Sequence, residues 1–282
     1  MFIKKRGKVK MAEFFNQLSL AREAATITSA MGIKPPTHAE APVDFISEKI
    51  KQRAGGNIEK VLMFNPDAIG MWMFQKYFDC YEAVYKHADI CVPYRSPMKS
   101  VTPVCFATMY TGALPDVHGI KVYEKPVLST DTIFDTLVRA GKRVAIVAIS
   151  GSSMASIFLG REIDYYILPP GTDDYLMEAK ATELLNENKH DFIVAYGQGY
   201  DDEEHKSGPE SPSSLSEFKK QIAIFDRLST RAKEIWKNDR FLLVFAPDHG
   251  AHLCANGKGA HGEEIPEDLN ILHFYGAYSP SK

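Results

Sequence analysis

The stretch Phe241-Leu-Leu-Val-Phe-Ala-Pro-Asp-His-Gly250 decides the fold that the rest of the chain follows. Its first six residues, 241–246, are a continuous apolar run, which is typical of a strand covered on both faces. The run leads into Asp248 and His249, so a buried strand delivers a carboxylate and an imidazole to one point. In parallel sheets, ligand-binding residues commonly follow the carboxyl ends of strands. The tripeptide 248–250 alone is also an ordinary turn, so its interpretation depends on the rest of the chain.

Similar apolar runs recur along the chain and alternate with stretches of helical periodicity. The stretch 215–236 shows this periodicity, since Leu215, Phe218 and Ile222 fall on one helical face. Strands that alternate with helices predict an α/β fold, with a mainly parallel sheet and helices on both faces. The predicted strands are 61–64, 144–149, 192–195 and 241–246, and the predicted helices are 131–140, 175–186 and 215–236.

Residues 1–58 are predicted to be a helical N-terminal extension, and residues 59–282 to be the main α/β domain. Within the extension, helices are expected over 11–31 and 43–53. They carry no evident chemistry, so packing against the main domain or against a second subunit in a homodimer is the preferred interpretation. The chain also starts with a basic stretch, 4–10, which we expect to be a solvated tail rather than a nucleic-acid-binding arm.

The composition is that of an ordinary soluble globular protein, with 282 residues of which 45% are hydrophobic and 24% charged. A formal net charge of -3 argues against nucleic-acid binding driven by bulk charge. No run of about 18 apolar residues is present, so no membrane span is expected. The 4 cysteines form no Cys-x-x-Cys pair, which favours free thiols in a reducing compartment and a cytoplasmic location.

Two further strands are followed by candidate metal ligands. Asp67 comes directly after the strand 61–64, where capping of a turn is an equal alternative. Asp201 and His205 follow the strand 192–195, in a polar stretch from 201 to 214 that we expect to be a loop. An acidic, solvated loop is the alternative explanation for this pair.

A hydroxyl completes the set of candidate residues. Thr102 precedes Pro103, and proline favours the first position of a helix, so Thr102 is expected to be a helix N-cap. A hydroxyl at a helix N-terminus sits in a positive field, which favours an alkoxide and binds a phosphoryl group.

Histidines gather beyond the last predicted strand. His249, His252 and His261 fall within one loop region, and such a group indicates metal binding because imidazole is a common metal ligand. Carboxylates, imidazoles and one hydroxyl at strand ends suffice for two metal ions that share a nucleophile. Ligation without a thiolate suits Zn²⁺, with Mn²⁺ as an alternative.

The motifs together resemble those of a known family. The segment from Thr102 to Ile120, which contains Thr111-Gly-Ala-Leu-Pro-Asp-Val-His-Gly119, is similar to the nucleophile segment of type I phosphodiesterases and nucleotide pyrophosphatases, in the alkaline phosphatase superfamily. Asp201-x-x-x-His205-Lys-x-Gly-Pro209 resembles the second motif of that family, Asp248-His-Gly250 the third and His261-Gly262 the last. The match keeps the family's order and covers roughly residues 61–278, so it implies an alkaline phosphatase-like catalytic domain.

The resemblance implies a role for each position. Thr102 would attack phosphorus, and water would later hydrolyse the phospho-threonine. The ligands of one metal ion would be Asp67, Thr102, Asp248 and His249, and those of the other Asp201, His205 and His261. The implied function is a metal-dependent hydrolase of small phosphate esters, with phosphodiester or nucleotide pyrophosphate bonds preferred. A phosphonoacetate hydrolase-like enzyme and a non-catalytic binding protein on the same fold are the alternatives.

The chain departs from the family three residues after the nucleophile. Many of these phosphodiesterases carry Asn there, as a donor to a phosphoryl oxygen, whereas this chain has Cys105, a weak donor. Either support for the phosphoryl oxygens comes from elsewhere, or the activity is low, or the substrate differs. Tyr94, Tyr123 and Phe158 are candidates to stack a base, although packing is the commoner role for such residues.

Overall fold

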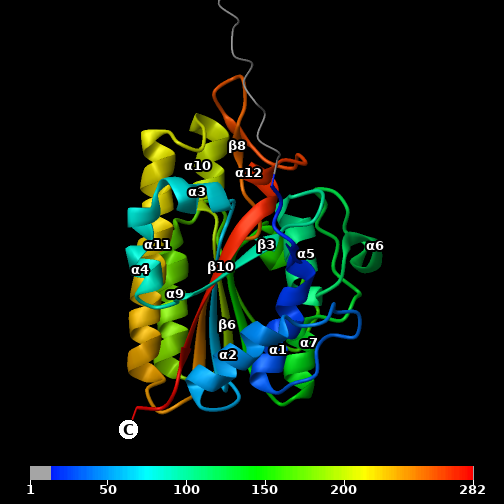
Figure 1. The fold of residues 1–282 in the computed structure, drawn as a ribbon, viewed down its shortest axis with the longest axis vertical. Helices are drawn as coiled ribbons and strands as arrows, with labels where there is room; N and C mark the ends of the chain where they lie inside the picture. Colours follow the sequence, from blue (N-terminus) through cyan, green and yellow to red (C-terminus); the bar gives the residue numbers. More distant parts are fainter. Residues whose placement is uncertain (1–13, 282) are drawn as a thin grey trace, which may run out of the picture.

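The computed structural model describes residues 14–281, and its centre is a mixed sheet of 8 strands (Figure 1). In spatial order the strands are β1 (Leu18–Ser19), β3 (Ile90–Arg95), β10 (Asn270–Tyr278), β7 (Phe241–Phe245), β2 (Lys60–Pro66), β6 (Phe192–Gly197), β4 (Val144–Ile149) and β5 (Asp164–Leu168). A separate antiparallel pair, β8 (His252–Leu253) and β9 (Gly259–Ala260), lies beyond β7.

The predicted parallel sheet is confirmed by its four central strands. β7, β2, β6 and β4 are neighbours and run parallel, and each corresponds to one predicted apolar run. Phe64 of β2 pairs with Phe245 of β7 and with Ala195 of β6, so the carboxyl ends of the three strands are level. The residues that follow these ends therefore leave the sheet at the same edge.

Four strands of the sheet were not predicted, namely β1, β3, β5 and β10. β10 runs antiparallel to both β3 and β7. Pro93 interrupts the pattern of β3, because proline is disfavoured inside strands. Glycine at position 276 in β10 has a steric explanation, because a Cβ there would overlap the backbone carbonyl of His87.

Helices cover both faces of the sheet, as predicted (Figure 1). Alternate strand residues point to opposite faces, so Val61 and Met63 join one apolar cluster and Leu62 and Phe64 the other. The first face carries η1 (Leu20–Arg22), α1 (Glu23–Met31), α2 (Asp44–Ala54), α5 (Thr102–Thr111), α7 (Ile133–Arg139) and α8 (Ser153–Ser156). The second face carries α3 (Met71–Lys76), η2 (Phe78–Tyr81), α4 (Glu82–Tyr85), α9 (Asp174–Glu187), α10 (Gly199–Ser207) and α11 (Pro212–Ile235), while α6 (Pro115–His118) and α12 (Pro266–Leu269) are short connecting helices.

The N-terminal helix begins later than predicted. The structure has β1, then η1, and α1 only from Glu23, so the expectation of one helix over 11–31 is wrong for 14–22. The strand forms because residues 18–19 pair in parallel with β3, and the Ser19 side chain then caps η1 by accepting from Ala21 N–H. Residues 11–13 and the basic stretch 4–10 lie outside the described residues.

The helices of the N-terminal segment pack against the sheet. α2 matches the predicted helix 43–53, and Ala24, Ile27 and Ile50 are buried in the cluster on the first face. This is one of the two kinds of packing that we expected for the segment, and a homodimer through it stays a prediction.

Two expected absences can be stated for the described residues. Cys80, Cys91, Cys105 and Cys254 are free thiols in the described part of the chain. None of the helices within residues 14–281 combines the length and the apolar character needed to span a bilayer.

Candidate functional site

Asp67, Asp248 and His249 meet at the level edge of the central strands. Their side chains are fully buried or nearly so, and one ligand atom from each lies within 4.8 Å of the others. His249 Nε2 is 3.3 Å from Asp67 Oδ1 and 3.4 Å from Asp248 Oδ2. Asp67 follows β2 and Asp248 follows the neighbouring β7, so the sheet register brings the two carboxylates together. We call Asp67, Asp248 and His249 the first cluster.

Thr102 Oγ1 borders the first cluster. It lies 3.5 Å from Asp67 Oδ2 and 3.3 Å from His249 Nε2. The expectation that Thr102 is an N-cap is wrong, because Val101 is the cap and Thr102 is the first helical residue of α5. The hydroxyl is thus turned toward the cluster and still stands at the N-terminus of a 10-residue helix.

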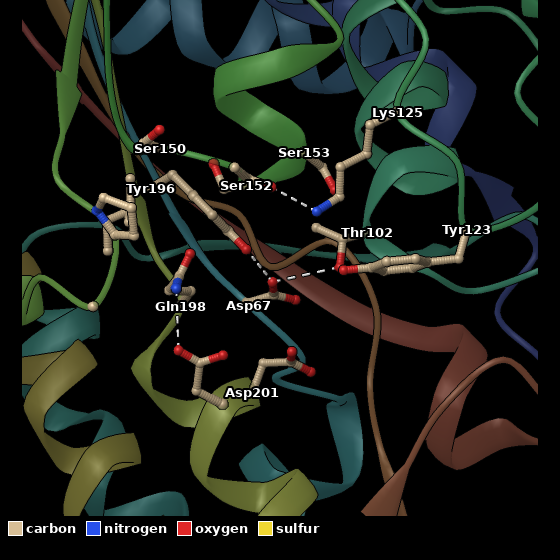
Figure 2. Close-up of a pocket in the computed structure, with 15 residues that line it drawn as sticks. Asp67, Thr102, Tyr123, Lys125, Ser150, Ser152, Ser153, Tyr196, Gln198 and Asp201 are labelled. Carbon is tan, nitrogen blue, oxygen red and sulfur yellow. Dashed lines mark hydrogen bonds between the residues drawn. The ribbon is translucent and has the colours of Figure 1, made fainter.

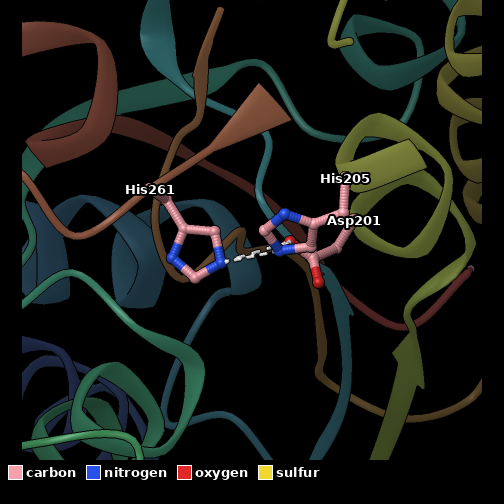
Figure 3. Close-up of side chains that lie close together, drawn as sticks. All are labelled: Asp201, His205 and His261. Carbon is pink, nitrogen blue, oxygen red and sulfur yellow. Dashed lines mark hydrogen bonds and ion pairs between the residues drawn. The ribbon is translucent and has the colours of Figure 1, made fainter. Parts of the chain in front are cut away.

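A second cluster consists of Asp201, His205 and His261 (Figure 3). Asp201 Oδ1 lies 3.4 Å from His205 Nε2 and 3.5 Å from His261 Nε2, and the two Nε2 atoms are 3.2 Å apart. The expected loop over 201–214 is wrong, because 199–207 forms α10 and α11 starts at Pro212. Residues four apart on a helix share one face, which is why Asp201 and His205 point the same way.

The two clusters lie side by side. The rings of His249 and His261 are stacked, with their centroids 4.1 Å apart. All the predicted ligands, including Thr102, are therefore gathered at one place. His252 is not among them, because its Nδ1 is 2.8 Å from Asp268 Oδ1.

The histidines of both clusters share one hydrogen-bonding pattern. Nδ1 of His205, His249 and His261 lies 3.2, 3.1 and 2.8 Å from the backbone carbonyls of Gly259, Gly250 and Ser100 respectively. A carbonyl only accepts, so each Nδ1 carries the hydrogen and donates it. In a neutral ring, Nε2 then carries no hydrogen and has a lone pair available. Histidines that bind a metal ion through Nε2 have this tautomer.

Burial keeps two of these rings neutral. It lowers the pKa of His261 to about 2, with the nearby His249 contributing, and it lowers the pKa of His249 as well. Nε2 of either ring is therefore available as a ligand at neutral pH.

The carboxyl groups of the two clusters are buried or largely buried and lie close to one another. Burial raises the pKa of Asp67, Asp201 and Asp248, the last to about 7, and repulsion between carboxylates raises the first two further. Among the atoms of residues 14–281, Asp67 Oδ1, Asp201 Oδ1 and Asp248 Oδ2 find no hydrogen-bond partner. Buried oxygens of this kind fit a divalent cation, which would supply both the missing partner and the missing charge.

A cavity of about 280 Å³ opens next to Thr102 and both clusters (Figure 2). Asp67, Thr102 and Asp201 belong to its lining. The rest of the lining consists of Tyr123, Lys125, Ile149, Ser150, Gly151, Ser152, Ser153, Pro170, Gly171, Tyr196, Gln198 and Asp202.

Several lining residues were missed by sequence reasoning. Tyr196 donates a hydrogen bond from its hydroxyl to Asp67 Oδ2. Ser150, Ser152 and Ser153 follow the predicted strand 144–149, so the strand-end rule that found Asp67 would also have found them. Lys125 lies in an irregular segment and carries no comparable signal.

The three aromatic candidates and Cys105 differ in burial and in whether they line the cavity. Tyr94 and Phe158 are buried in the core, whereas Tyr123 is 60% exposed and lines the cavity. The thiol of Cys105 is buried in the apolar cluster beneath α5. Cys105 does not line the cavity, and burial together with the nearby carboxylates of Asp248 and Asp67 raises the pKa of its thiol.

Comparisons with known proteins add the following sequence relationships. No family model matches the chain. A GPI ethanolamine phosphate transferase 2 from Candida albicans is 32% identical over 90 residues, which are 32% of this chain and 10% of that protein. The chain thus spans a tenth of the length of the curated relative that it matches.

Solved structures share the fold over most of the chain. Phosphonoacetate hydrolase from Sinorhizobium meliloti 1021, in complex with phosphonoformate, is 18% identical with a TM-score of 0.52, over 71% of this chain and 59% of that chain. Murine ectonucleotide pyrophosphatase / phosphodiesterase 5, an inactive threonine-to-alanine variant in complex with AMP, is 15% identical with a TM-score of 0.61, over 79% and 88%. The C-terminal periplasmic domain of a phosphoethanolamine transferase from Campylobacter jejuni is 18% identical with a TM-score of 0.54, over 78% and 80%. These structures are members of the alkaline phosphatase superfamily, and the protein has the fold of that superfamily.

Proposed function

We propose that the protein hydrolyses phosphate esters with two divalent cations and with Thr102 as the nucleophile. The observation that carries the proposal is the position of Thr102 Oγ1, 3.3 Å from His249 Nε2 and 3.5 Å from Asp67 Oδ2. The second cluster lies against the first through the stacked rings of His249 and His261. Two ligand clusters beside one hydroxyl fit an in-line displacement at phosphorus.

Each cation would be held by one of the two groups of ligand atoms. Asp67, Asp248, His249 and Thr102 would hold one, and Asp201, His205 and His261 the other. When bound, the cations supply positive charge that lowers the pKa of the hydroxyl and offsets charge on the phosphoryl group. Carboxylate and imidazole donors suit Zn²⁺, with Mn²⁺ as the alternative.

The side chains themselves perform a double displacement. Thr102 Oγ1 forms a bond to phosphorus while the bond from phosphorus to the leaving oxygen breaks, which gives a phospho-threonine. The hydroxyl proton is directed toward Asp67 Oδ2, whose position is fixed by the Tyr196 hydroxyl. Water then attacks the phospho-threonine, restores the hydroxyl and releases the second product, while the positive end of α5 favours the phosphoryl group throughout.

Phosphodiester and nucleotide pyrophosphate bonds are the preferred substrates. The murine structural neighbour is an ectonucleotide pyrophosphatase / phosphodiesterase. The variant solved in complex with AMP has one threonine replaced by alanine and is inactive. We infer a corresponding role for Thr102 here. The phosphonoacetate hydrolase neighbour favours a second candidate, cleavage of a carbon–phosphorus bond at the same site.

Turnover by the metal-loaded protein tests the proposal. The substrates are the p-nitrophenyl esters of phosphate, thymidine phosphate and phenylphosphonate, with phosphonoacetate as a fourth. We expect hydrolysis of the thymidine ester, a loss of at least about a hundredfold in Thr102→Ala and a smaller loss in Thr102→Ser, which keeps a hydroxyl. Release of phosphate from phosphonoacetate alone would select the second candidate.

A non-catalytic binding protein on the same fold predicts a different result. The wild type would show no turnover of any substrate with both cations verified as bound, and Thr102→Ala would bind AMP as tightly as the wild type. That pair of results would reject the enzymatic proposal.

A further inference from the structure

Tyr123 and Lys125 lie two residues apart in the segment that connects α6 to α7, and both line the cavity beside Thr102. Figure 2 shows both side chains pointing from this segment toward Thr102. The metal-ligand clusters lie on the other side of the same hydroxyl. A phosphoryl group at Thr102 would therefore meet the clusters on one side and these two side chains on the other.

Lys125 is held in place by the wall of the cavity. Its Nζ donates to the carbonyl of Gly151 at 2.6 Å, which leaves further N–H groups to point into the cavity. Lys125 is the one cationic side chain among the described residues that line this cavity, and the lining also contains Asp67, Asp201 and Asp202. With the proposed cations bound at Asp67 and Asp201, a further fixed cation on the opposite wall fits an anionic ligand that lies between them.

Tyr123 adds a neutral donor beside this cation. Its ring is 60% exposed, and Lys125 Nζ lies 5.1 Å from the ring centroid. Burial in the core therefore does not account for the position of the ring, whereas a hydroxyl directed at the reacting atoms does. A phenol O–H donates to an anionic oxygen without adding charge.

We propose that the Tyr123 hydroxyl and Lys125 Nζ bind the phosphoryl oxygens of the substrate at Thr102. This inference rests on the proposed function. The pair would donate to the phosphoryl oxygens, which the buried Cys105 does not do. Donors fixed near a reacting group stabilise the charge that develops there. The two side chains also affect specificity differently. The charge of Lys125 favours a dianionic phosphate monoester over a monoanionic diester, whereas Tyr123 supports both equally.

Two substitutions and a matched control test the inference. Lys125→Met keeps the length of the side chain without its charge, and Tyr123→Phe keeps the ring without its hydroxyl. Lys121→Met is the control, because Lys121 lies in the same segment but pairs with the exposed Asp116 at 2.6 Å, away from the cavity. All three positions are at the surface or half-buried, so the variants should fold, as thermal melting would verify.

The kinetic readout compares p-nitrophenyl phosphate with thymidine 5′-p-nitrophenyl phosphate. Lys125→Met should lower kcat/KM by about a hundredfold for the monoester and about tenfold for the diester, and Tyr123→Phe should lower both by about tenfold. Lys121→Met should match the wild type. Equal values for Lys125→Met and Lys121→Met on both substrates would overturn the inference while the proposed function stands.

A binding measurement keeps the inference testable without turnover. Inorganic phosphate is titrated into each metal-loaded protein by calorimetry. Weaker binding by at least about tenfold in Lys125→Met, with no change in Lys121→Met, supports the inference. A wild type that binds phosphate in this way but turns over no ester refutes the proposed function alone, and equal affinities in all variants refute the inference.

Discussion

Asp67 is the residue on which the contacts of the site converge. Its Oδ2 accepts from Tyr196 and faces Thr102, and its Oδ1 faces His249. One carboxylate thus orients the hydroxyl with one oxygen and presents the other to the first cluster. The hydrogen bond from Tyr196 matters because a carboxylate free to rotate would hold neither geometry.

His118 is buried like His249 of the first cluster, but its two ring nitrogens form hydrogen bonds within the fold. The backbone N–H of Ile120 donates to His118 Nδ1 at 3.2 Å, so Nδ1 accepts and Nε2 carries the hydrogen, which it donates to Thr108 Oγ1 at 3.0 Å. Both nitrogens are used within the fold, so His118 has a structural role. Burial lowers the pKa of His118 from 6.5 to about 4.

This pKa predicts a pH dependence of stability that His118 causes. Between about 6.5 and 4 the unfolded chain binds a proton at His118 and the folded chain does not, so stability falls as the pH falls through this window. His118→Gln should be less stable at pH 7.5 but lose about 1–3 kcal/mol less than the wild type between pH 7.5 and 4.5. Urea unfolding at the two pH values measures the difference. Parallel losses in both proteins would show that His118 does not titrate as stated.

At the scale of elements, α10 is the part that sets the second cluster. The helix follows β6 directly, and the buried carboxylate of Asp174 accepts from the backbone N–H groups of Gln198 and Gly199 at its start. Asp201 and His205 therefore leave a fixed helix start at a spacing of one turn. On its other side α10 packs against the β8–β9 pair, where the buried Glu204 lies over Gly259.

Gly259→Ala should disturb α10 through Glu204. A Cβ at position 259 would overlap Glu204 Oε2, and the backbone oxygen of Glu204 is close as well. We expect a loss of stability of about 1–3 kcal/mol, because overpacking forces side chains and backbone to shift. Chemical denaturation measures the loss, and the affinity for Zn²⁺ should fall with it, since His205 follows Glu204. A variant as stable as the wild type would mean that Glu204 turns aside without moving the helix.

At the scale of the whole molecule, the sheet gathers residues that are far apart in the chain. Asp67 follows β2, Asp248 follows β7 and Asp201 follows β6, three neighbouring parallel strands. Level strand ends bring these carboxylates to one edge, and the cost is repulsion among buried charges. A bound cation should therefore stabilise the whole fold.

Removal of divalent metal should lower the thermal stability of the protein. Zn²⁺ at about a hundred times its dissociation constant contributes about 2.7 kcal/mol per site, which corresponds to a rise in Tm of about 5 °C or more. Differential scanning calorimetry with a chelator and then with added Zn²⁺ measures the shift. The control is the double variant Asp67→Asn, Asp201→Asn, whose metal-free form should be more stable than the wild type and respond little to Zn²⁺. A wild type whose Tm ignores Zn²⁺ would contradict the assignment of both clusters.

Sequence patterns predicted the central sheet, and they named the candidate ligands that the structure brings together at one edge. Apolar runs identified β2, β4, β6 and β7 because strands covered on both faces must be apolar throughout. Motif spacing singled out the ligands because each stands just beyond such a strand or on a short segment near it. The second cluster was found even though 199–207 was taken for a loop, since side chains four apart also face one way on a helix.

Tertiary structure alone decided the rest. β1, β3 and β10 are strands because they pair with neighbouring strands of the sheet. Pro93 in β3 and Gly276 in β10 also weaken the local sequence pattern of a strand. The same holds for Cys105, which the core covers, and for Lys125, which the wall of the cavity fixes beside Thr102. The sequence by itself determined which residues are candidate metal ligands and where the central strands lie, because ligand chemistry and apolar runs are local properties. Which oxygen faces which nitrogen, and what lines the cavity, depends on contacts between segments far apart in the chain, which only the folded molecule defines.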